Sequence, residues 1–177
     1  MTAAGLRGET SARRKLNRLQ DDTAPAGWTT FSLKEVNQLA AEEIAASGLT
    51  GVSDPRVVLG NNTAIGTARI DFARVRESAT GEAPGTLGRM LLGGDKDVLV
   101  EASFQSGDGM CTIDVVRASV NGLELRGRLL DWIIENYLLP LYPEAKIGKP
   151  FAMGHRVERV EITPTRARFR VDPKIAV

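Results

Sequence analysis

The chain has 177 residues, 42% hydrophobic and 25% charged, a balance typical of one globular domain with a sizeable core. Its net charge of +1, from 23 basic and 22 acidic residues, excludes a field strong enough to indicate a nucleic-acid partner. The single cysteine excludes a disulfide framework. No stretch approaches the ~20 apolar residues of a membrane-spanning helix, and the first residues lack the apolar region of a secretory signal.

Residues 1–27 are predicted to form a polar N-terminal helix followed by a linker. Thr10 or Ser11 suits the N-cap of that helix, because both side chains can accept a hydrogen bond from a first-turn amide. The segment DDTAPAGW contains the breakers expected of a linker. We therefore expect residues 28–177 to form a single domain.

The segment FSLKEVNQLAAEEIAASG gives the clearest helix prediction. Ser32 and Glu35 are spaced as a capping box, in which each side chain bonds an unpaired amide of the first turn. Apolar residues then recur at helical spacing, namely Leu33, Val36, Leu39, Ala40 and Ile44.

Three pairs of alternating segments predict antiparallel strands and turns. They are PRVVLG with TAIGTARIDF, KDVLVEASF with MCTIDVVRASV, and RVERVEI with RARFRV. The alternation slips near Val115 and Val116, which predicts a bulge. The expected inward positions are Ala64, Gly66, Ala68, Ile70, Phe72, Val98, Val100, Ala102, Phe104, Ala167, Phe169 and Val171.

The segment GRLLDWIIENYLLPLYP is the most apolar of the chain, and it predicts a helix from about Leu125 to Leu139. Its wide apolar stripe requires cover, which a curved sheet could supply. Antiparallel strands with separate helices indicate an α+β fold. Two interpretations of the contact between this helix and the sheet remain open: a dry closed core, or a groove that holds an acyl chain. Periodicity alone favours the closed core.

No residues are spaced as a catalytic or metal centre. His155 is the only histidine and stands beside no nucleophile motif, so we expect a structural or surface role. Cys111 is expected to be a small buried hydrophobic residue. Arg13, Arg14 and Lys15 could contact anionic lipid headgroups, although a solvated helix face is the simpler interpretation. These patterns favour a binding protein without metal or cofactor over an enzyme.

Several segments resemble small bacterial cell-envelope lipid-binding proteins of the tubular lipid-binding (TULIP-like) group. The resemblance covers roughly residues 31–171 and includes FSLKEVNQLAAEEI, GLTGVSDPRVVLGNN, TAIGTARIDF and the ending ERVEITPTRARFRV. Its shared features are Glu35 and Asn37 in the capped helix, and Gly51, Val52 and Asp54 before the first strand.

The resemblance implies a strongly curved antiparallel sheet wrapped around the long amphipathic helix, with lipid held between them. The implied apolar channel consists of Leu129, Ile133, Ile134, Tyr137, Leu138, Ile70, Phe72, Val98, Val100, Phe104 and Phe169. We therefore expect non-catalytic binding or transport of a phospholipid or another long-chain amphiphile in the periplasm or cell envelope, with peripheral membrane contact and no nucleic-acid partner. The alternative is a structural or adaptor protein with a closed core that binds another envelope protein.

Overall fold

The computed structural model describes residues 10–86, 89–90, 93–135 and 146–175, which form an α+β protein with antiparallel sheets. The α+β prediction is confirmed. In chain order the elements are α1 (Ser11–Leu19), β1 (Gly27–Ser32), α2 (Leu33–Ala46), β2 (Val52–Leu59), β3 (Thr63–Ile70), α3 (Phe72–Thr80), β4 (Lys96–Gly107), β5 (Met110–Val120), β6 (Leu123–Leu125), α5 (Gly127–Ile133), β7 (Phe151–Ala152), β8 (Val157–Thr163) and β9 (Arg166–Val171).

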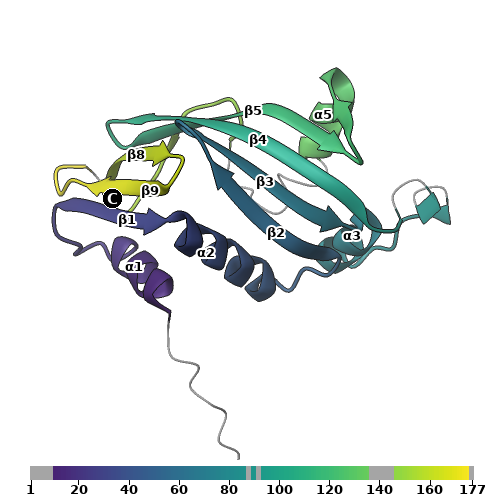
Figure 1. The fold of residues 1–177 in the computed structure, drawn as a ribbon, viewed down its shortest axis with the longest axis horizontal. Coiled ribbons are helices and arrows are strands. Elements are labelled where there is room, and N and C mark those ends of the chain that lie inside the picture. The colour runs from purple at the N-terminus through teal and green to yellow at the C-terminus, as the bar shows by residue number, and fades with distance from the viewer. Residues whose placement is uncertain (1–9, 87–88, 91–92, 136–145, 176–177) are drawn as a thin grey trace, which may run out of the picture.

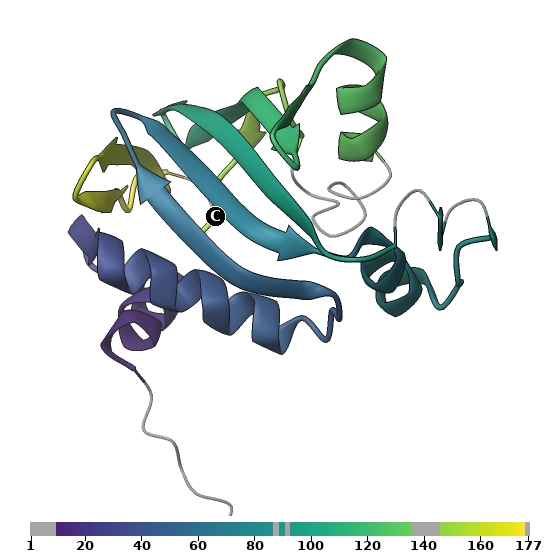
Figure 2. The same ribbon diagram turned by 45° about the vertical axis from the view of Figure 1, so that its right-hand side comes forward.

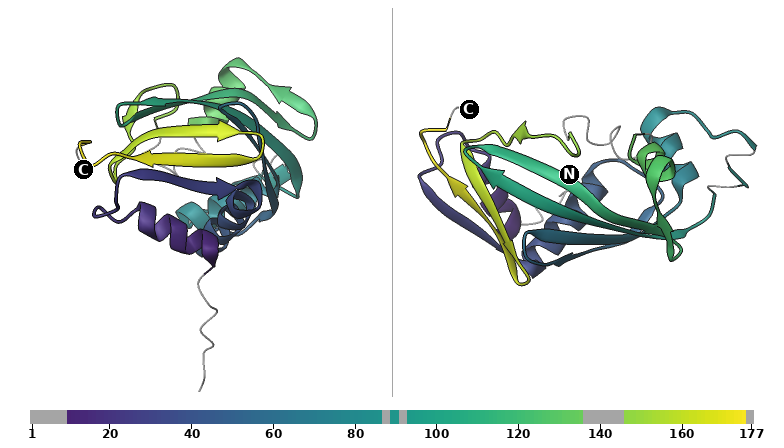
Figure 3. Two further views of the ribbon diagram at one scale, coloured as in Figure 1. Left: turned by 60° about the vertical axis from the view of Figure 1, so that its left-hand side comes forward. Right: turned by 90° about the horizontal axis from the view of Figure 1, so that it is seen from above.

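The strands form a small sheet and a large sheet (Figure 1). The small sheet has the order β1-β9-β8, and the large sheet has the order β2-β3-β4-β5-β6 with β7 paired to β5. All these pairings are antiparallel. In Figure 3 the two sheets lie at an angle to each other, and side chains of both sheets line one cavity.

Ser106 of β4 and Asn62 of the turn between β2 and β3 join the two sheets along one seam. The Ser106 hydroxyl bonds both the amide and the carbonyl of Val160, at 2.8 and 2.9 Å. The backbone N–H of Asn62 donates to the carbonyl of Ile162 at 2.9 Å. The side-chain oxygen of Asn62 accepts from the backbone N–H of Ile162 at 3.3 Å. These bonds satisfy backbone groups that neither sheet pairs by itself.

Helix α2 covers the edge strand β2 (Figure 2). The predicted capping box is present, because the Ser32 hydroxyl accepts from the Glu35 amide while the Glu35 carboxylate accepts from the Ser32 amide. One turn further, the Asn37 side chain accepts from the Val57 amide at 2.7 Å and donates to the Val57 carbonyl at 2.8 Å. Asn37 therefore protects the backbone of an otherwise exposed sheet edge.

Helix α1 is attached to α2 by ion pairs and by apolar contact. Its predicted cap is Thr10, which accepts from the Arg13 amide at 3.2 Å. Arg13 contacts the carboxylates of Glu42 and Glu43, and Lys15 contacts Glu35 at 2.8 Å. Leu19 is buried in a cluster that includes Phe31. The N-terminal helix therefore shares a core with the rest of the chain, and two of its cations are already paired.

The predicted curvature and the predicted long helix need correction. The large sheet is open, with β2 and β6 at its edges, and it is not strongly curled around a helix. Leu125 belongs to β6, where it pairs with Ala118, and α5 begins only at Gly127 because Arg126 is still extended. The remainder of the predicted helix, from residue 136, lies outside the described residues.

Strand β1 and helix α3 were not predicted, and neither were the short strands β6 and β7. Residues 27–32 form β1, where we expected the end of a linker, because Trp28 to Phe31 pair with β9. Phe72 begins α3 instead of continuing the preceding strand, because Asp71 caps the helix by accepting from the Arg74 amide. The predicted bulge is confirmed, since the register shifts between Glu101 and Ala102 opposite this segment of β5.

Candidate functional site

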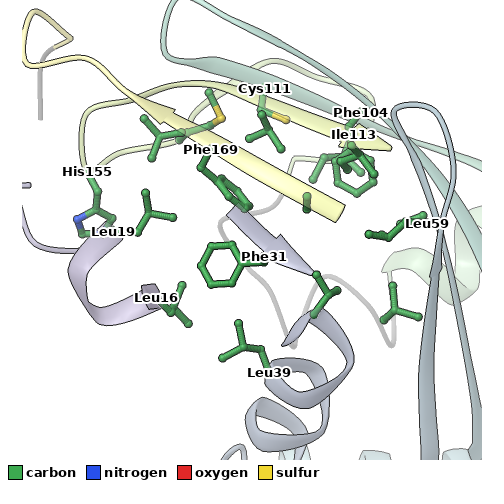
Figure 4. Close-up of a pocket in the computed structure, with 18 of the residues that line it drawn as sticks. Leu16, Leu19, Phe31, Leu39, Leu59, Phe104, Cys111, Ile113, His155 and Phe169 are labelled. Atoms are coloured by element: carbon green, nitrogen blue, oxygen red, sulfur yellow. The ribbon is translucent and has the colours of Figure 1, made fainter. Parts of the chain in front are cut away.

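The main candidate site is an apolar cavity of about 470 Å³ between the inner faces of the two sheets (Figure 4). Helices α1 and α2 close one side of it through Leu16 and Leu39. Phe31 of β1 and Phe169 of β9 project into this region, with their rings edge to face and 5.7 Å apart. The volume lies within the range of ~300–1,000 Å³ usual for ligand-binding pockets.

The lining of this cavity is almost entirely apolar. Among 20 lining residues, only Gln20 and His155 are polar if the buried thiol of Cys111 is counted as apolar. The others are Leu16, Leu19, Phe31, Val36, Leu39, Val57, Leu59, Ala64, Phe104, Cys111, Ile113, Phe151, Met153, Val157, Val160, Ile162, Ala167 and Phe169. Water inside such a space would find few hydrogen-bond partners.

Packing around the cavity is incomplete. No large side chain in the described part of the chain is fully buried, and even Phe31 retains 2% exposure. The walls of the cavity therefore present apolar surface that a bound guest would cover.

The rim of the cavity is polar at one end only. Gln20 and His155 are the only exposed residues among those that line it. His155 Nδ1 lies 3.1 Å from Oδ1 of Asp22, and its side chain is 46% exposed. The other lining residues are buried or half-buried, so Gln20 and His155 contribute the exposed polar groups of the lining.

The turn that carries His155 has an unusual backbone. Gly154, His155 and Arg156 have φ angles of 72°, 48° and 57°. The left-handed region is uncommon for residues other than glycine, although asparagine, aspartate and histidine adopt it more often than the rest, and such residues cluster at ligand-binding and active sites. The Val157 amide donates to the Gly154 carbonyl at 3.0 Å, which fixes the turn. The strained turn thus positions His155 at the rim.

A second apolar cavity lies further along the inner face of the large sheet. Its volume is about 130 Å³, and helices α3 and α5 cover it. The two cavities share no lining residue. Between them the sheet presents small residues, and a Cβ atom added at Gly66 would meet no atom within 4 Å. The small inward residues of β3 therefore leave room above the sheet, as their sequence indicated.

The residues predicted to line one channel are divided between these cavities. Phe104 and Phe169 line the larger cavity. Leu129 lines neither cavity and is 53% exposed. Tyr137 and Leu138 lie outside the described residues. The smaller cavity is lined by Ile70, Phe72, Val98, Val100, Ile133 and Ile134.

Several residues of the larger cavity were missed by the sequence analysis. Leu16 and Leu19 lie in a segment that was assigned to a separate polar region, although their spacing of three residues places them on one helix face. Phe31 was assigned to the start of a helix, although the run Trp28 to Phe31 has the composition of a strand. Met153 and His155 belong to a loop without periodicity, so no pattern could place them.

Cys111 is buried against this cavity, as predicted. Burial raises the pKa of its thiol, because the charged thiolate would lose its hydration. Within the described residues, no group of three or more histidine, cysteine or acidic side chains is placed to hold a metal ion. Among the same residues, no helix is long and apolar enough to cross a membrane.

Comparison with known proteins adds no relative. A scan against protein-family models finds no match to this chain, and neither the curated proteins nor the solved structures give a significant match.

Proposed function

We propose that this protein binds and carries a long-chain amphiphile, such as a phospholipid or a fatty acid, without chemical conversion. The observation that carries the proposal is the cavity of about 470 Å³, whose lining is apolar except at one end. Burial of an acyl chain there would contribute ~0.8 kcal/mol per methylene. The single polar end supports a guest with one polar head beside Gln20 and His155.

The resemblance to tubular lipid-binding proteins supports the same class of ligand and a location in the periplasm or cell envelope. Its short motifs have structural roles here. Glu35 completes the helix cap, Asn37 binds the β2 edge, and Asp54 has the positive φ of an irregular strand entry. Membership of that group therefore remains part of the proposal, while the cavity supports ligand binding independently.

Mass spectrometry of organic extracts from the purified protein tests this function. We expect a lipid or fatty acid to co-purify in a stoichiometric amount. An Ala64→Phe variant, purified in parallel, should carry much less, because Ala64 lines the cavity and a phenyl ring would occupy it. Extracts without lipid would contradict the carrier proposal and favour the closed-core adaptor.

A further inference from the structure

The outer face of the small sheet carries a cluster of arginines around an exposed tryptophan. We define the basic face as the charged and aromatic side chains on the outward side of the small sheet, namely Trp28, Arg159, Glu161, Arg166, Arg168 and Arg170. The strand register places these residues on the side opposite the cavity-lining residues Phe31, Ala167 and Phe169.

Positive charge is concentrated on this face. Glu161 is its one outward carboxylate, and Arg168 binds it at 2.5 and 2.8 Å. Glu158 lies beside the face with a side chain only 12% exposed, 3.5 Å from Arg159 and 3.6 Å from Arg170. Four arginines against these two carboxylates leave a charge of +2, whereas the entire chain has +1. The rest of the molecule is therefore slightly acidic.

The outer face of the large sheet provides a contrast. There Arg69 lies within 3.6 Å of Asp95 and 3.9 Å of Asp97, and Arg117 lies 3.3 Å from Glu101. Carboxylates on that face thus offset its arginines. Arg166 on the small sheet has an exposed side chain and no ion pair with any described residue.

Trp28 gives the basic face an amphipathic residue at one edge. Trp28 is 41% exposed, and the Arg168 guanidinium lies 4.5 Å from the centre of the indole ring. An exposed indole contributes little to the core, whereas tryptophan is enriched where protein meets the interface of a bilayer. Arginine side chains close by would contact anionic headgroups at the same depth.

One end of the basic face lies at the start of β8, close in the chain to the turn that carries His155. Trp28 pairs with Arg170, which pairs with Arg159, at the end of the sheet where β8 begins. His155 stands two residues before that strand.

We propose that the basic face docks this protein onto a lipid bilayer that contains anionic phospholipid. Charge complementarity selects an anionic surface, and Trp28 favours a bilayer interface over nucleic acid. The single tryptophan of the basic face and a chain net charge of +1 do not provide the stacking platform and strong field of a nucleic-acid site.

Vesicle co-sedimentation tests this surface with the full chain. We expect binding to vesicles of phosphatidylcholine mixed with phosphatidylglycerol, little binding to phosphatidylcholine alone, and loss of binding in high salt. Replacement of Arg159, Arg166 and Arg170 by glutamine should weaken the partition coefficient by about fivefold per arginine, on the order of a hundredfold in total. The control replaces the exposed Arg56, Arg69 and Arg117 of the large sheet by glutamine, which removes the same charge and should leave binding nearly unchanged.

Fluorescence gives a second readout that does not depend on charge alone. In a Trp132→Phe background, Trp28 is the sole tryptophan, and its emission should shift to the blue with anionic vesicles but not with phosphatidylcholine. Equal binding to both vesicle types, equal loss in the two triple variants, or an unshifted Trp28 spectrum would overturn the proposal. Retardation of duplex DNA without vesicle binding would overturn it in favour of nucleic acid.

The docking surface and the carrier function can fail separately. Docking does not require an occupied cavity, so Ala64→Phe should bind anionic vesicles as the unmodified protein does. Vesicle binding by a protein that holds no lipid would support the docking surface and reject the carrier function. A lipid-loaded protein that does not bind anionic vesicles would support the carrier function and reject the docking surface.

Discussion

The two ends of the large sheet's inner face differ in what covers them. At one end the small sheet, α1 and α2 enclose a cavity of about 470 Å³, while α3 and α5 leave only about 130 Å³ at the other end. The most apolar segment of the chain begins at the end with less space. Within the described residues, the larger space for a guest therefore arises from the separation of the two sheets.

The largest difference between these regions should appear when an apolar side chain is truncated in each. Phe31→Ala removes the most buried aromatic ring and its edge-to-face contact with Phe169, so we expect a loss of about 3–5 kcal/mol in the free energy of unfolding. Leu129→Ala at α5 should change it by less than about 0.5 kcal/mol, because Leu129 is exposed. Urea denaturation measures both values, and similar losses would break the contrast.

A smaller effect should come from the charged attachment of α1. Hydrogen bonds from Lys15 and from the Ser32 amide lower the pKa of Glu35, so Glu35 stabilises the fold above the ordinary glutamate pKa. This contribution is lost as the pH falls through the lowered pKa. Glu35→Gln retains a group that can bond the Ser32 amide but removes the charge beside Lys15.

We therefore expect Glu35→Gln to cost at most about 1 kcal/mol at neutral pH and nothing in acid, where the native carboxyl is protonated. Denaturation midpoints at several pH values measure this. The exposed Glu82→Gln serves as the control and should show no such dependence. If the free energy of unfolding falls by the same amount in acid for the Glu35→Gln variant and for the unmodified protein, the Lys15 contact contributes nothing.

Local patterns predicted much of the fold. The capping box at Ser32 and Glu35, the bulge near Val115 and Val116, and the closing hairpin were all readable, because each depends on residues close in sequence or on strict alternation. The start of α3 also had a local signal, Asp71 as N-cap and Gly81 as a left-handed C-cap, which the alternation of the preceding strand obscured.

The main cavity could not be predicted in the same way. Its lining comes from most of the helices and strands, usually one to three residues from each, and periodicity shows which face of an element is apolar but not which element lies opposite. The division into two sheets places Phe169 across from Phe104 instead of beside it in one sheet. His155 reaches the rim through a strained turn that no local pattern indicates.

Titration with a fluorescent fatty acid such as parinaric acid tests most directly whether the larger cavity is the binding site. We expect saturable binding of one probe per chain. Ala64→Phe should weaken it at least about tenfold, while the matched Val100→Phe, which fills only the smaller cavity, should bind normally. Absence of saturable binding, or weakening by Val100→Phe but not by Ala64→Phe, would contradict the assignment.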